Sequence, residues 1–173
     1  MTFSGNQYRT RFKPASLPSD FQMRITFEAD DRAWIPSGPS GSQGIDPPPE
    51  LRPADWEQEQ KPLVVVNVFD GGERHKVEVR FDQGEFVEMD NNPPRFGLTD
   101  GQPNRNLDPY IVGLLEQHAG TDDEPASPEP SSHLWTAAVP KDLGPGTHTV
   151  TIRSTDPYNQ RSQASQTFEV ASP

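Results

Sequence analysis

The stretch from residue 131 to residue 170 constrains the fold most, because runs of β-prone residues alternate there with signals for chain reversal. Residues 134–139, 147–153 and 167–170 are rich in β-branched and aromatic side chains. The segments between them, PKDLGPG and DPYN, place proline and glycine where the chain must turn. The pattern predicts three antiparallel strands that close a β-sandwich, and it contains no catalytic motif.

Earlier segments add strands with the same two-residue period. Residues 7–13 and 21–28 are expected to pair as a hairpin, and the second strand places its apolar residues on one face. Residues 63–69 are apolar on both faces, which is typical of a central strand buried between two layers. Asp70-Gly71-Gly72 is a strong turn signal and predicts a meander through residues 76–81 and 85–89.

One helix is expected after Asp108. This residue can cap a helix with Pro109 in its first turn, and apolar residues follow at helical spacing up to His118. The chain is therefore predicted to be all-β. Its expected architecture is an immunoglobulin- or fibronectin-III-like β-sandwich of about eight strands, with long Pro-rich loops and one short helix.

Composition indicates where the loops lie. The chain has 173 residues, which suits a single domain over residues 1–173, but only 31% of them are hydrophobic. The 20 prolines and 13 glycines concentrate in three segments. Residues 30–61 and 91–107 are expected to be long loops, and residues 119–132 an acidic Pro-rich linker. Without these excursions, the remaining strands suffice for one sandwich of roughly 100 residues.

Charge and cysteine content exclude several function classes. A formal net charge of −11 disfavours nucleic acid and anionic membranes as partners, because phosphates would be repelled. The absence of cysteine excludes disulfides, thiol catalysis and cysteine-ligated zinc. No apolar run approaches the roughly 20 residues of a membrane span, and the N-terminus lacks the plan of a signal peptide. These features leave the cellular compartment open.

Several motifs in a fixed order resemble a known family. HLW, the run DL-GPGTHTVTIRSTD-Y and the terminal TFEV resemble the C-terminal domain of calcineurin-like metallophosphoesterases. GNQYRTRFK, FQMRI, VVVNVFDGGERHKVEVRFD, FVEM and DPY are similar to earlier parts of that domain. The resemblance spans nearly the whole chain. It implies an accessory module beside a metallophosphoesterase catalytic domain, in cis or in trans, and a periplasmic or extracellular location.

The residues needed for phosphoesterase chemistry are not gathered in this sequence. Such a catalytic core uses several His, Asp and Asn side chains around two metal ions. The four histidines are scattered singly, and Gly5-Asn6 is followed by Gln7 where the family's catalytic motif would continue with histidine. We therefore expect a chain that is not an enzyme and binds no cofactor or metal. The scattered histidines are His75, His118, His133 and His148.

Two weaker metal hypotheses remain open at this point. His133 and His148 could share a metal if their strands pair, although hydrogen-bonded positions at the edge of the core are the simpler interpretation. The acidic clusters Asp30-Asp31 and Asp122-Asp123-Glu124 could bind calcium, but their spacing matches no defined calcium loop. A solvated acidic linker is the favoured interpretation of the second cluster.

Aromatic residues outside the strand pattern are the candidate contact residues. Trp34, Trp56, Phe96 and Tyr158 could dock on a partner domain or stack on a ligand. Alternatively, they pin the long loops to the sandwich. Trp135 lies within an expected strand and is predicted to belong to the core.

Two functions follow from these observations. The first is a non-catalytic accessory domain that packs on a metallophosphoesterase catalytic domain, with residues 30–61 and 91–107 at the rim of the substrate cleft. The alternative is an autonomous module that binds glycan at a cell surface, motivated by Trp34 and Trp56. A sandwich fold serves many functions, so the architecture alone does not choose between them.

Overall fold

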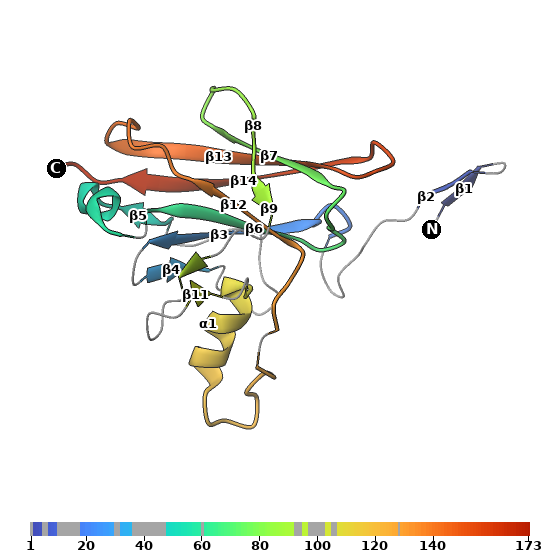
Figure 1. Cartoon of the computed structure of the whole chain (residues 1–173), viewed down its shortest axis with the longest axis horizontal. Coiled ribbons are helices and arrows are strands. Elements are labelled where there is room, and N and C mark those ends of the chain that lie inside the picture. Colours follow the sequence, from blue (N-terminus) through green and yellow to red (C-terminus); the bar gives the residue numbers. More distant parts are fainter. Residues whose placement is uncertain are drawn as a thin grey trace.

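The computed structural model describes residues 2–4, 7–9, 18–29, 32–35, 48–59, 61–91, 95–96, 103–104, 107–127 and 129–173. In this part of the chain, two five-stranded sheets pack together, accompanied by one α-helix (Figure 1). This arrangement confirms the predicted all-β sandwich.

The first sheet has the order β4-β3-β6-β12-β9, and all its neighbours are antiparallel. Its strands are β3 (Met23–Ala29), β4 (Arg32–Trp34), β6 (Leu63–Val68), β9 (Asp90–Asn91) and β12 (Leu134–Ala138). Val66 on β6 lies opposite Ile25 on one side and Trp135 on the other. Strand β6 is thus the centre of this sheet.

The second sheet has the order β5-β14-β13-β7-β8. Strands β13 and β14 pair along ten residues each, whereas the short β5 adds to β14 in parallel. The strands are β5 (Glu50–Leu51), β7 (Lys76–Phe81), β8 (Val87–Glu88), β13 (Gly146–Thr155) and β14 (Arg161–Val170).

The remaining elements lie outside these two sheets. Two strand pairs stand alone: β1 (Thr2–Ser4) with β2 (Gln7–Arg9), and β10 (Arg95–Phe96) with β11 (Pro103–Asn104). A 3-10 helix, η1 (Pro53–Glu57), precedes β6, and helix α1 (Pro109–His118) precedes β12. Helix α1 has the predicted position and length. None of the described helices is long and apolar enough to cross a membrane.

The core fills the space between the sheets. Phe27 on β3 and Phe168 on β14 are both buried, and their ring centroids lie 5.1 Å apart, so this contact joins the two sheets. Trp135 is buried in the same cluster, as predicted. The outer face of the first sheet is covered too, because Val65, Thr26 and Thr136 point away from this core and are nevertheless buried. Strand β6 is therefore buried on both faces, as its sequence predicts.

Strand pairing differs from the sequence-based prediction near the N-terminus. The expected hairpin of residues 7–13 with 21–28 is wrong, because β2 pairs with β1 while β3 pairs with β4 and β6. The alternating pattern identified β3 as a strand, but it carries no information about which partner the strand takes.

Of the predicted meander, the pairing of residues 76–81 with 85–89 is confirmed by β7 and β8, but the pairing of β6 with β7 is wrong, and so is the predicted C-terminal three-strand unit. Strand β6 is flanked by β3 and β12 and offers no free edge, so the chain crosses after Asp70 to β7 in the other sheet. Gly71 permits this crossing, since a Cβ atom there would lie 2.6 Å from the Trp135 indole. Strand β12 likewise belongs to the first sheet and does not pair with β13. The pairing of β13 with β14 agrees with the prediction.

The segments expected as long loops contain short elements. Residues 30–61 include β4, β5 and η1, and residues 91–107 include the end of β9 and the pair β10–β11. The described residues of the 119–132 segment form turns and irregular chain without a helix or strand.

Candidate functional site

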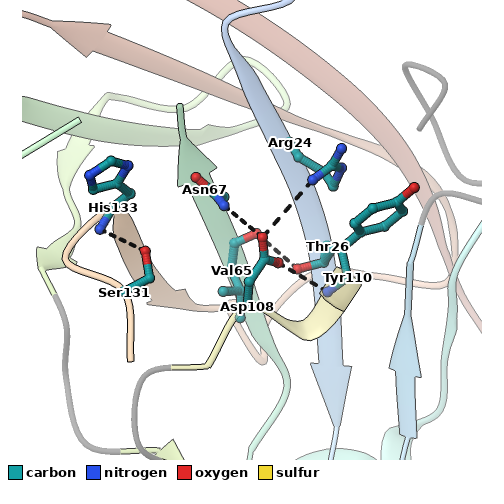
Figure 2. Close-up of polar contacts among 8 residues, drawn as sticks. All are labelled: Arg24, Thr26, Val65, Asn67, Asp108, Tyr110, Ser131 and His133. Carbon is teal, nitrogen blue, oxygen red and sulfur yellow. Dashed lines mark hydrogen bonds and ion pairs between the residues drawn. The ribbon is translucent and has the colours of Figure 1, made fainter. Parts of the chain in front are cut away.

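A polar cluster fixes the start of helix α1 on the outer face of the first sheet (Figure 2). The carboxylate of Asp108 is buried and accepts from the Tyr110 backbone N–H at 3.0 Å, which is the helix cap predicted from the sequence. Its other oxygen accepts from the Asn67 side chain at 2.6 Å and lies 4.0 Å from the Arg24 guanidinium. These contacts join β3, β6 and α1.

Arg24 completes this cluster by stacking on aromatic rings. Its guanidinium carbon lies 3.7 Å from the centroid of the Tyr110 ring and 5.3 Å from that of Phe69. Burial lowers the pKa of Arg24, and the nearby Asp108 and Tyr110 oppose that shift. These contacts make the cluster a structural joint between helix and sheet, although the Nε atom of Arg24 and the Oδ1 atom of Asn67 are buried without a hydrogen-bond partner among the described residues.

The two histidines considered as a metal pair do not lie on paired strands. His133 immediately precedes β12, and its backbone N–H donates to the Ser131 hydroxyl at 3.1 Å (Figure 2). His148 lies on β13 in the second sheet. The strand pairing that would have brought them together is therefore not formed. Across the residues with described positions, no three His, Asp or Glu side chains gather in a way that could hold a metal ion.

His148 instead connects two turns. One ring nitrogen lies 2.8 Å from the Asp82 carboxylate and the other 2.7 Å from the Gly144 carbonyl, so both nitrogens face acceptors. Both contacts are hydrogen bonds only when the ring carries two protons. Burial lowers the pKa of His148, but the hydrogen bonds to Asp82 and Gly144 and the charge of Glu169 outweigh it, and the net shift is upward.

Asp82 is the acidic partner in this contact. Its carboxylate also accepts from the Thr149 backbone N–H at 2.9 Å. The hydrogen bonds from His148 and Thr149 lower the pKa of Asp82 below its usual value. Together the two side chains hold the turn after β7 against the start of β13.

A small polar pocket lies at one end of the sandwich. Its cavity volume is about 40 Å³, and its walls come from three separate segments. These are the residues before β3, the β6–β7 connection, and the two strands of the β13–β14 hairpin with the turn between them. His75 contributes one wall, and its Nδ1 atom has no hydrogen-bond partner among the described residues. We call this the turn-end pocket; its lining residues are Gln22, Asp70, His75, Ser154, Asp156, Gln160, Arg161 and Ser162.

The candidate aromatic residues occupy different environments. Trp56 in η1 is only 4% exposed and donates its indole N–H to the Val139 carbonyl at 3.0 Å. Trp34 is partly buried against the core. Tyr158 is 78% exposed, and Phe96 lies on β10 with its side chain outside the described residues. Trp56 and Trp34 thus pack against the sandwich, and their positions give the glycan alternative no support.

The other candidate residues have ordinary surroundings where they are described. Gly5-Asn6 and Asp30-Asp31 lie outside the described residues. Asp122-Asp123 is exposed, and the Glu124 carboxylate accepts from the Gly120 backbone N–H at 2.6 Å. His118 is the last residue of α1, where a cation complements the helix dipole.

The turn-end pocket could not be found from the sequence, because only the topology brings its three segments together. Its one local signal is Asp156-Pro157-Tyr158-Asn159, a sequence that predicts a chain reversal and not a site.

The chain is similar to known proteins in sequence and in structure. Residues 1–161 match the family described as the C terminal of calcineurin-like phosphoesterase. No curated protein matches the chain. Among solved structures, the crystal structure of CopC from Methylosinus trichosporium OB3b is similar over 63% of this chain and 74% of that chain, with 14% sequence identity and a TM-score of 0.31. The family match covers most of the chain, and the chain belongs to the family of C-terminal domains of calcineurin-like phosphoesterases.

Proposed function

We propose that this chain is a non-catalytic accessory domain that packs against the catalytic domain of a calcineurin-like phosphoesterase, in cis or in trans. The observation that carries this proposal is the family match over residues 1–161. The phosphoesterase domain supplies the bond-breaking chemistry, and this sandwich supplies a rigid surface beside it.

The way in which polar side chains are used supports the proposal. Two of the buried carboxylates form structural contacts: Asp108 caps α1, and Glu78 binds both Lys76 and Arg153 on the second sheet. His148 holds two turns together. Side chains that are committed to the fold in this way are poor candidates for a nucleophile, a general base or a metal ligand.

Residues 30–61 and 91–107 are proposed as the parts that shape the rim of the substrate cleft. The first segment connects β3 to β6 through the short edge strands β4 and β5, and in the second segment β10 pairs only with β11 within the described chain. Loops held by a rigid scaffold are common contributors to binding sites.

The association with a catalytic domain can be measured directly. The proposed partner, a calcineurin-like phosphoesterase catalytic domain, is produced separately, and its mixture with residues 1–173 is followed by sedimentation velocity. The proposal expects a 1:1 complex and a changed KM for a phosphodiester such as bis-p-nitrophenyl phosphate. Two components that sediment independently, with kinetics unchanged both in the mixture and in the joined protein, would contradict it.

A further inference from the structure

His148 contacts a surface connection of the sandwich. Residues 139–145, which we call the β12–β13 connection, carry the chain from the first sheet to the second. The Nδ1 atom of His148 lies 2.8 Å from a carboxylate oxygen of Asp82, and its Nε2 atom lies 2.7 Å from the carbonyl oxygen of Gly144. Asp82 directly follows β7. The imidazole therefore lies between the turn after β7 and the β12–β13 connection.

The outer part of this connection has few strong attachments. Lys141 forms an ion pair with Glu57 of η1, but both side chains are 67% exposed, and such pairs contribute little in water. Leu143 packs against the core while only partly buried. By contrast, the side chain of His148 is 13% exposed, so its contact with Gly144 is better shielded from water. This contact is therefore the polar attachment that restrains the connection more.

The two contacts of the imidazole need different numbers of protons. A doubly protonated ring donates to both acceptors, whereas a neutral ring has one N–H group and one lone pair. The ionised carboxylate of Asp82 is the stronger acceptor, and the Thr149 backbone N–H holds it in place at 2.9 Å. The neutral ring therefore keeps its proton on Nδ1 and turns the Nε2 lone pair toward the Gly144 carbonyl. Two acceptors repel each other at this distance, so Gly144 has to move away.

The groups around the ring determine the pH at which it loses this proton. Asp82 faces it from the turn after β7, and the charge of Glu169 acts from β14. The neighbouring ring of Phe168, at 5.5 Å between centroids, and the Gly144 carbonyl are uncharged. Burial lowers the pKa of His148, but the hydrogen bonds and the two carboxylate charges outweigh burial, and the net shift is upward. The proton is therefore lost above the ordinary pKa of about 6.5.

We propose that His148 is a pH-sensitive latch on the β12–β13 connection. The doubly protonated ring holds the connection closed. When the pH rises and the Nε2 proton leaves to solvent, Gly144 is released while Asp82 stays bound. Because Lys141 of the connection pairs with Glu57, the opening moves a residue that contacts η1. This inference goes beyond the proposed function and does not rest on it.

Pairs of nitroxide spin labels can follow the opening, because the chain has no native cysteine. One pair joins Asp142→Cys in the connection to Gln163→Cys on β14, and the control pair joins Glu50→Cys on β5 to the same strand position; all three residues are exposed. Double electron–electron resonance is expected to give a narrow distance distribution for the first pair at about pH 5.5 and a broad one at about pH 9. The control pair should give the same distribution at both pH values.

Variants and ring spectra separate the latch from a general effect of pH. In His148→Gln the distribution of the first pair should not change with pH, and Asp82→Asn should lower the midpoint of opening. Glu57→Gln, which removes the exposed ion pair, should leave the midpoint unchanged. In the wild type, nitrogen-15 spectra should show that Nε2 is the atom that loses the proton, at the same midpoint. A distribution that stays narrow while His148 titrates, or a proton lost from Nδ1, would overturn the latch.

Discussion

Replacing Trp56 should destabilise the whole domain, because this side chain attaches the 30–61 segment to the sandwich. The indole is 4% exposed and donates to the Val139 carbonyl at 3.0 Å, immediately after β12. Truncation of a buried tryptophan to alanine costs about 3–5 kcal/mol. Trp56→Phe keeps most of the apolar contact but removes the donor, and a buried carbonyl that loses its partner costs about 1–3 kcal/mol.

Urea denaturation followed by circular dichroism measures both costs. For a domain of this size, 1 kcal/mol corresponds to about 2–4 °C in melting temperature, so Trp56→Ala should lower the melting temperature by about 6–20 °C. Tyr158→Ala is the matched control on an exposed aromatic residue and should change the free energy of unfolding by less than about 0.5 kcal/mol. If Trp56→Ala lowers the free energy of unfolding by less than about 1 kcal/mol, Trp56 does not attach the 30–61 segment to the sandwich as argued.

Two further predictions concern charged groups. The pKa of His148 is raised in the folded state, so the contribution of His148 to folding stability is complete below about pH 6.5 and is lost as the pH rises through the folded-state pKa. The pKa of Asp82 is lowered in the folded state, so its contribution is complete above about pH 4 and is lost in acid. The free energy of unfolding should therefore fall between about pH 6 and pH 9 in the wild type and fall less in His148→Gln. An equal dependence of this free energy on pH in the two proteins would contradict the stabilising role of His148. Asp108→Ala should lower the free energy of unfolding by about 2–4 kcal/mol, because it removes the cap of α1 and the buried acceptor of the Asn67 side chain. A denaturation midpoint equal to that of the wild type would contradict the role of Asp108 as a joint between helix and sheet.

Local features of this fold were predictable from the sequence, whereas strand partners were not. The Asp108 cap and the double apolar character of β6 depend on residues within a few positions of each other, so the pattern reports them directly. Pairing depends on which strand edges are already occupied. The Asp70-Gly71-Gly72 sequence would suit a hairpin, but both edges of β6 are taken, and the glycine serves the close approach to Trp135.

The candidate sites show the same division. The sequence identified Tyr158 and Trp56 as unusual aromatic residues, but only burial separates the exposed one from the one that pins a loop. Arg24 and Asn67 meet Asp108 across long sequence separations, and the turn-end pocket is formed by three separate segments. No local pattern encodes these contacts, since they arise from the packing of whole sheets.

The central claim is that this domain leaves phosphoester chemistry to a neighbouring catalytic domain. The most direct measurement is hydrolysis of bis-p-nitrophenyl phosphate by residues 1–173 alone, with Mn²⁺ or Zn²⁺ added, beside the protein that also carries the catalytic domain. The account predicts that the isolated chain shows only the background rate of the metal ion and that all turnover belongs to the joined protein. Metal-dependent turnover by the isolated chain, saturable and lost on unfolding, would contradict it.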